Sequence, residues 1–231
     1  MAWTTQKWIN LRDTAAYVTD GSGQVVLANG VDTSLLAYPQ SLSINGDTFN
    51  VGWTTGAGND GERDKNSALD ARLAGFHFSS NSAGSPSILK VEMLGGVGQY
   101  EIRLASGVPE GGSHNPYIKI KDGTTLVATI DGSAGIANFM DATGANMTAA
   151  NWPSTNAALT ITFNDTSGTG GTPVMFIEIG DTAAAGVTRL NTVGIKKVVS
   201  GPNITSVSTG TPREGASLTI TGTAFGASQG G

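Results

Sequence analysis

Short segments in which apolar and polar residues alternate constrain this chain more than any other feature. Such alternation is typical of β-strands that bury one face. Seven strands at short intervals predict an all-β fold, an antiparallel β-sandwich. Residues 193–199 alternate more weakly, and we expect them to form the last strand of the same domain. The seven segments are residues 24–27, 88–93, 100–104, 117–121, 125–130, 159–163 and 174–179.

Turn signals separate these segments. An Asp-Gly pair, Asp122 and Gly123, lies between two of them and predicts a tight hairpin that fixes the register of its strands. Residues 95–98, which include three glycines, predict another turn, and residues 166–173 predict a surface loop.

Composition excludes several classes of protein. Of the 231 residues 33 are glycine and only 13% are charged, which is typical of many short strands joined by turns. A net charge of -5 leaves no basic stripe, so we expect no nucleic-acid partner. The chain has no cysteine, which excludes disulfides and thiolate zinc sites. No run of 18 apolar residues occurs, so we expect no membrane insertion.

The first residues lack the charged and then apolar pattern of a secretory signal peptide. We therefore expect synthesis in the cytosol. A β-rich, adhesin-like chain of this kind is typical of a bacteriophage virion component, which assembles in the bacterial cytoplasm and is released by lysis. The expected location is the virion surface.

The end of the sequence predicts a second module. Residues 202–226 contain two strand patterns and no more, and residues 200–202 form a short linker. We expect a jelly-roll-type sandwich over residues 1–200 and the truncated start of an immunoglobulin-like sandwich over residues 201–231. This organisation predicts that the chain is the N-terminal piece of a longer modular protein.

Two resemblances add to this interpretation. Residues 8–199 resemble the galactose-binding-like, carbohydrate-binding-module-like sandwiches of phage virion proteins and polysaccharide-active enzymes, which implies a jelly roll that binds carbohydrate or provides structure. Residues 202–226 resemble the start of an IPT/TIG immunoglobulin-like module, which implies a spacer or interaction unit. The first resemblance rests on residues 52–64, 70–75, 100–105, 122–123, 141–144 and Trp152, and the second on the Pro-x-Ile-x-x-Val and Gly-x-x-Leu-x-Ile-x-Gly-x-x-Phe-Gly patterns.

One stretch gathers acidic residues with oxygen ligands of the kind that calcium prefers. Its spacing does not match an EF-hand loop, and three basic residues accompany it, so ion pairing or a solvated loop is the favoured interpretation and a structural calcium ion is the alternative. Asp70 and Arg72 are predicted to join a structural salt-bridge network that also includes Arg63 and Asp64. The candidate calcium ligands are Asp60, Asp64 and Asp70.

The sequence favours binding over catalysis. The same carboxylates could in principle hydrolyse glycosides, but most surface loops have such groups. The two histidines, His77 and His114, lack the spacing of a zinc site. No nucleophile elbow or phosphate-binding loop occurs. We therefore expect no enzymatic activity and no cofactor apart from the possible calcium ion.

Tryptophans are the candidate contact residues. Trp53 lies next to the charged stretch and is predicted, with Arg63 and Asp64, to bind glycan, although aromatic residues are more often buried. Trp3 and Trp8 precede the first clear strand, and we expect them to contact a neighbouring subunit or the particle.

Together these patterns predict a bacteriophage virion surface protein, as a head decoration, head fibre or tail fibre. We expect it to attach to capsid or tail proteins by its N-terminal sandwich, to form a homotrimer, and to bind cell-surface polysaccharide weakly. The alternative is a carbohydrate-binding accessory module of a polysaccharide-degrading enzyme. A third interpretation is a fragment of a bacterial surface adhesin.

Overall fold

The chain divides into two compact units, Met1–Lys197 and Val198–Gly231. No helix in the described part of the chain is long and apolar enough to cross a membrane. The computed structural model describes residues 8–11, 39–55, 60–62, 73, 75–80, 84, 86–107, 115–132, 139–148, 156–164, 171–180, 186–199, 203–209 and 218–223.

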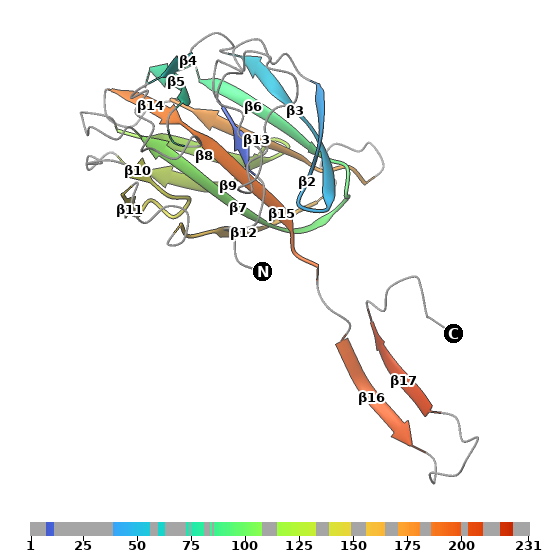
Figure 1. The fold of residues 1–231 in the computed structure, drawn as a ribbon. Helices are drawn as coiled ribbons and strands as arrows, with labels where there is room; N and C mark the ends of the chain where they lie inside the picture. The colour runs from blue at the N-terminus through green and yellow to red at the C-terminus, as the bar shows by residue number, and fades with distance from the viewer. Residues whose placement is uncertain are drawn as a thin grey trace. The chain divides into compact units, whose positions relative to one another are not determined.

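Two six-stranded sheets form the main part of the first unit (Figure 1). The first, called here the β7 sheet, has the order β1-β15-β7-β10-β11, with β12 also paired to β7. All of its pairings are antiparallel. Its strands are β1 (Ile9–Asn10), β7 (Gly98–Gly107), β10 (Phe139–Met140), β11 (Asn146–Met147), β12 (Leu159–Phe163) and β15 (Thr192–Lys197).

The second sheet, called here the β13 sheet, has the order β2-β3-β6-β13-β8-β9 and is also antiparallel throughout. A small third sheet has the order β14-β5-β4. The β13 sheet consists of β2 (Gln40–Ile44), β3 (Asp47–Thr55), β6 (Ser87–Met93), β8 (Tyr117–Asp122), β9 (Thr125–Asp131) and β13 (Val174–Ile179), and the third sheet of β4 (Asp60–Glu62), β5 (Gly75–Ser80) and β14 (Val187–Leu190).

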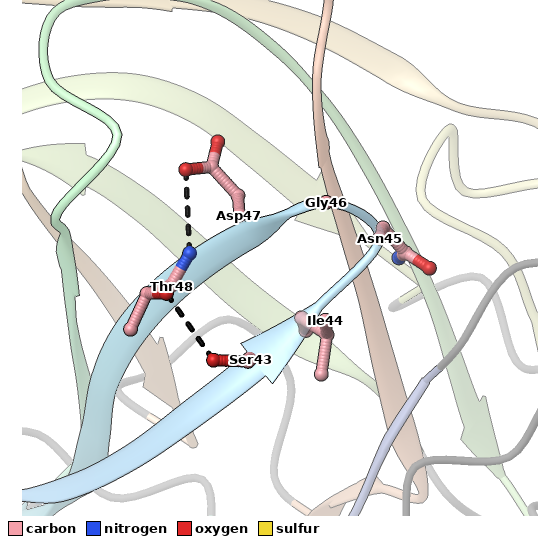
Figure 2. Close-up of a pocket in the computed structure, with 6 residues that line it drawn as sticks. All are labelled: Ser43, Ile44, Asn45, Gly46, Asp47 and Thr48. Atoms are coloured by element: carbon pink, nitrogen blue, oxygen red, sulfur yellow. Dashed lines mark hydrogen bonds between the residues drawn. The ribbon is translucent and has the colours of Figure 1, made fainter.

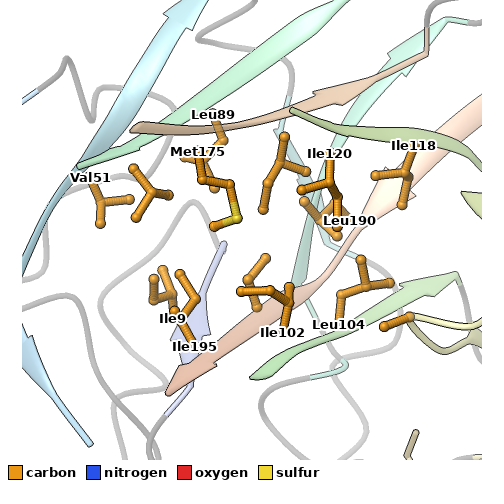
Figure 3. Packing of buried hydrophobic residues seen from close by; sticks show 14 of the residues in the cluster. Ile9, Val51, Leu89, Ile102, Leu104, Ile118, Ile120, Met175, Leu190 and Ile195 are labelled. Carbon is orange, nitrogen blue, oxygen red and sulfur yellow. The ribbon is translucent and has the colours of Figure 1, made fainter. Parts of the chain in front are cut away.

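The hydrophobic core lies between the two large sheets. In β6 buried and half-buried residues alternate along the whole strand, so one face points to the core and the other away from it. Figure 3 shows side chains of the β13 sheet, such as Val51 and Met175, opposite side chains of the β7 sheet, such as Ile102 and Ile195. This arrangement is a two-layer antiparallel β-sandwich, which confirms the predicted fold class.

Two tight hairpins fix the register of the β13 sheet. Asn45 and Gly46 both have positive φ, 51° and 83°, as the type I′ turn between β2 and β3 requires. The predicted hairpin between β8 and β9 is confirmed, but Asp122 is its last paired residue, opposite Thr125. Its central residues are Gly123, with φ of 55°, and Thr124, so the turn lies one residue later than the Asp-Gly pattern suggested.

Most of the predicted strands are confirmed. Residues 88–93, 100–104, 117–121, 125–130, 159–163 and 174–179 all lie in strands, and residues 193–199 correspond to β15, which ends at Lys197. The predicted turn at residues 95–98 joins β6 to β7. Residues 24–27 lie outside the described residues. In the second unit β16 (Asn203–Thr209) and β17 (Leu218–Thr223) form an antiparallel pair.

Tyr100 of β7 is fully buried in the core. Its hydroxyl donates a hydrogen bond to the backbone oxygen of Gly96 at 2.6 Å. Its ring packs edge to face against Phe49 and Phe163, with centroids 6.4 and 6.0 Å away. Burial raises the pKa of the Tyr100 phenol well above its ordinary value, and the nearby charge of Asp47 raises it further.

We therefore expect the unfolding free energy to fall at alkaline pH. An unfolded tyrosine ionises near pH 10, whereas the buried Tyr100 stays neutral. The stability that the neutral phenol contributes is therefore complete below about pH 10 and is lost as pH rises further, by about 1.4 kcal/mol per pH unit. Urea unfolding measured on both sides of this pH should show the loss. Tyr100→Phe should remove it and the control Tyr117→Phe should keep it; equal alkaline slopes in wild type and Tyr100→Phe would contradict this expectation.

Candidate functional site

The outer face of the β13 sheet, which points away from the core, presents an aromatic side chain among charged ones. Met175 and Ile177 of β13 point into the core, so Phe176 between them points outward, where it is partly exposed. In register, Phe176 lies between Lys90 of β6 and Lys121 of β8. The ring is thus flanked by a lysine on each neighbouring strand.

Carboxylates hold both lysines in place. Lys121 Nζ lies 2.5 Å from Glu178 Oε1, and Lys90 Nζ lies 3.0 Å from Glu92 Oε1. The Asn50 amide donates to the other oxygen of Glu92 at 3.0 Å. These side chains remain between 10% and 28% exposed. Both ion pairs therefore keep their donors and acceptors beside the Phe176 ring, within reach of solvent.

A second aromatic residue lies farther along the same face. Tyr117 of β8 is partly exposed and shares the outward side with Lys119 and Lys121, because Ile118 and Ile120 point into the core. The ammonium of Lys119 lies 5.5 Å from the centroid of the Tyr117 ring, within the range of a cation–π contact. We call the row of outward side chains on β13 and β8 the outer strip; its members are Phe176, Lys121, Glu178, Lys119 and Tyr117.

The opposite outer face, that of the β7 sheet, is different. The aromatic side chains described in its strands are all buried. There Trp8 and Phe139 pack with Leu73, Ala105 and Met147 into a second, smaller apolar cluster. On β7, burial lowers the pKa of the Arg103 guanidinium, whereas the negative charges of Glu101 and Asp141 raise it. Among the described aromatic residues, this sheet therefore offers no exposed ring comparable to Phe176.

A hollow of about 370 Å³ lies at the β2–β3 hairpin and is lined by residues 43–48. Figure 2 shows that its polar groups serve the hairpin itself. The Ser43 and Thr48 hydroxyls lie 3.2 Å apart, and Asp47 accepts from the Thr48 amide at 3.3 Å. Asn45 donates to the Ile195 oxygen at 2.9 Å. We assign Ser43, Asp47 and Thr48 a structural role within the hairpin, and we assign Asn45 a role in joining the hairpin to β15.

The structure corrects two predicted contact residues. Trp53 is only 3% exposed and belongs to the core between the sheets, so its ring cannot serve as a glycan platform. Trp8 is fully buried in the second cluster, next to Phe139, and it cannot contact a particle or a neighbouring subunit in this position. Both side chains follow the general tendency of tryptophan to bury its large apolar area.

The other predicted site residues cannot be compared. Arg63, Asp64, Asp70, Arg72 and Trp3 lie outside the described residues. Asp60 begins β4, but its side chain is not among those described. The predicted glycan contacts, salt-bridge network and calcium ligands therefore stay predictions. Among the side chains that the structure does describe, no group of three His, Asp or Glu residues lies close enough to hold a metal ion.

Sequence reasoning missed the two rings of the outer strip, although a signal was present. The lysines of residues 117–121 alternate with isoleucines, which assigns Tyr117 to the polar side of its strand. In residues 174–179 the single charged residue, Glu178, assigns Phe176 to the same side. The pairing of β13 with β8 brings these sides together, and this pairing is not readable from either segment alone.

The outer strip combines features that favour binding of a polyhydroxylated molecule. An aromatic ring provides an apolar face, and ligand sites typically add a few fixed polar groups that set orientation. Here the ammonium groups can donate to ligand oxygens and the carboxylates can accept from hydroxyl groups. Carbohydrates present an apolar C–H face and hydroxyl groups on the same molecule, so they match both kinds of contact.

No protein-family profile matches the sequence, and no curated protein matches it. Similar solved structures include two family 35 carbohydrate-binding modules. One, from an environmental isolate, is 12% identical, with 71% of this chain and 93% of that chain covered and a TM-score of 0.38. The other, from Clostridium thermocellum, is 11% identical, with 70% and 100% covered and a TM-score of 0.36.

A third similar structure is the module CBM6cm-2 of Cellvibrio mixtus lichenase 5A, solved in complex with cellotriose. It is 13% identical, with 60% of this chain and 96% of that chain covered and a TM-score of 0.25. All three are carbohydrate-binding modules. Because these identities and scores are low, what this chain binds has to be argued from its own residues.

Proposed function

We propose that the sandwich is a non-catalytic carbohydrate-binding module and that the outer face of the β13 sheet is its binding surface. The observation that carries this proposal is the position of Phe176, partly exposed at the middle of the face between two lysines that carboxylates hold in place. A sugar ring stacked on Phe176 would find Lys90 on one side and Lys121 on the other. Because the ion pairs already order these side chains, binding costs less conformational entropy.

Binding of polysaccharides by the full chain tests this proposal. We expect an array that carries cellulose, xylan, mannan, pectin, chitin and bacterial capsular polysaccharides to retain the wild type on at least one of them. Phe176→Ala should weaken that binding about tenfold or more, which corresponds to about 1.4 kcal/mol, because central aromatic contacts commonly dominate an interface. Titration calorimetry with the retained polysaccharide measures the change.

Val97→Ala is the matched control. Val97 lies in the turn between β6 and β7, outside the strands of the proposed binding surface, is 50% exposed and loses a similar kind of apolar side chain. It should bind as the wild type does. Thermal unfolding should show that Phe176→Ala remains folded. Retention of no polysaccharide by the wild type, or equal binding by a folded Phe176→Ala, would overturn the proposal.

Two biological settings accommodate such a module. One is an accessory module of a polysaccharide-degrading enzyme. The other is the virion surface protein predicted from the sequence, in which many weak glycan sites would act together by avidity. The division into the units Met1–Lys197 and Val198–Gly231 suits a modular protein of either kind. The outer strip supports the glycan-binding part of both readings.

The virion location, its capsid or tail partners, the trimer and the immunoglobulin-like nature of the second unit stay predictions. Labelling of purified phage particles with a gold-tagged antibody against residues 1–199 tests the location. Gold over the head would indicate a decoration or head-fibre protein, and gold at the tail would indicate a host-recognition protein. Unlabelled particles, together with polysaccharide binding by the pure chain, would favour the accessory module.

A further inference from the structure

The outer strip has an aromatic ring at each end. Tyr117 lies on β8 four residues before Lys121, and Lys121 is the register partner of Phe176 on the adjacent strand. With about 3.3 Å per residue along a strand and about 4.8 Å between strands, the backbone positions of the two rings lie roughly 14 Å apart. Both rings are partly exposed on the same side of the sheet.

Polar groups fill the distance between the rings. Glu178 and Lys119 are register partners, and Lys121 adds an ammonium next to Phe176. Glu178 accepts from Lys121, while Lys119 lies over Tyr117. Donors and an acceptor therefore follow one another along the strip, with a ring at either end.

The side of the strip toward β9 is open to solvent. Thr129 is the register partner of Lys119 and Leu126 that of Lys121, and both β9 residues are exposed. A site for one terminal sugar encloses that sugar, whereas an open row with two rings matches an extended ligand that contacts both.

We propose that the outer strip binds an internal segment of a linear polysaccharide, which lies along β8 and stacks on Phe176 and Tyr117 together. This inference rests on the proposed carbohydrate-binding function and adds the class of ligand and a second contact residue, Tyr117. The two contacts act like linked binding modules, since the second forms without a new loss of overall freedom. Only a ligand long enough to contact both rings binds more tightly because of the second ring.

Length dependence of binding tests the inference. The probes are oligosaccharides from disaccharide to hexasaccharide, made by partial hydrolysis of the polysaccharide that the wild type retains most strongly. We expect titration calorimetry of the full chain to show the hexasaccharide bound about tenfold or more tightly than the disaccharide. Tyr117→Ala should abolish this difference and change disaccharide binding by no more than about twofold. Phe176→Ala should weaken both ligands.

Tyr117→Phe is the conservative control, because it keeps the ring and should keep the length dependence. A role of Tyr117 only in holding Lys119 or the fold would instead lower binding of all lengths alike, and that result would overturn the inference. Binding that does not increase with length would also overturn it and would leave the proposed function standing. If no polysaccharide is retained at all, the proposed function fails and this inference fails with it.

Discussion

The Trp53→Ala variant is expected to lose about 3 to 5 kcal/mol of unfolding free energy, as removal of a buried aromatic side chain typically does. Trp53 is 3% exposed and lies opposite Leu89 of the neighbouring strand within the main core cluster. The truncation removes a large apolar area from the core and leaves a cavity between the sheets. Since a domain is stable by only about 5 to 15 kcal/mol, this single change should remove a large share of the stability of the sandwich.

Urea denaturation followed by circular dichroism measures this loss. Trp53→Phe should lose less, because the phenyl ring fills part of the space. Leu94→Ala is the exposed control, with a residue 45% accessible, and should stay within about 0.5 kcal/mol of the wild type. If Trp53→Ala keeps its stability and loses only polysaccharide binding, the ring is a ligand platform after all, as the sequence suggested.

Asp141→Ala is expected to destabilise the chain by about 3 kcal/mol or more, because buried donors left without a partner each cost about 1 to 3 kcal/mol. The Asp141 side chain is only 2% exposed and accepts four hydrogen bonds. Oδ1 accepts from the Thr143 amide at 2.8 Å, the Thr143 hydroxyl at 2.7 Å and the Ala145 amide at 3.1 Å. Oδ2 accepts from the Ala157 amide at 3.1 Å.

This carboxylate thus ties the turn between β10 and β11 to the segment that leads into β12. Thr143→Ala removes one of the four bonds and should cost about 0.5 to 1.5 kcal/mol. The loss of unfolding free energy for Asp141→Asn should lie between the losses for Thr143→Ala and Asp141→Ala, because the amide NH2 group presents a donor where one of the backbone donors needs an acceptor. Urea unfolding ranks the three variants. A loss below about 1 kcal/mol for Asp141→Ala would show that water replaces the carboxylate.

The sequence predicted most of the longer strands from their alternation and missed others, among them β3 and the two-residue strands. Residues 159–163 were identified with their correct limits, since period-two burial is a local property. The strand Asp47–Thr55 was missed, although the Asn45-Gly46 pair before it is a strong hairpin signal. Strands of two residues, such as Phe139–Met140, have no periodicity to recognise. They exist because β7 offers a free edge to pair with.

The sequence predicted the kinds of side chain in the candidate site, but it did not predict which residues form the site. An aromatic ring beside charged groups was expected at Trp53, because Trp53 is near a charged stretch in sequence. The structure places Trp53 in the core, and the outward ring on this sheet is Phe176, whose lysine neighbours lie on two other strands. Which residues share a sheet face depends on strand order, and strand order is set by the packing of the whole domain.

The pairing of β1 with β15 has a consequence for how the protein is made. Ile9 lies opposite Val193, and the Thr192 hydroxyl donates to the Ile9 oxygen across 183 residues of chain. Strand β15 lies between β1 and β7, so the interior of one sheet is incomplete until the final strand of the domain has left the ribosome. Because synthesis adds about 5 to 20 residues per second, about 10 to 40 seconds pass between the synthesis of Ile9 and that of its partner Val193. Until β15 is made, the edge of β7 that pairs with it stays open, and an unpaired strand edge in a nascent chain is prone to aggregation and favours binding by chaperones.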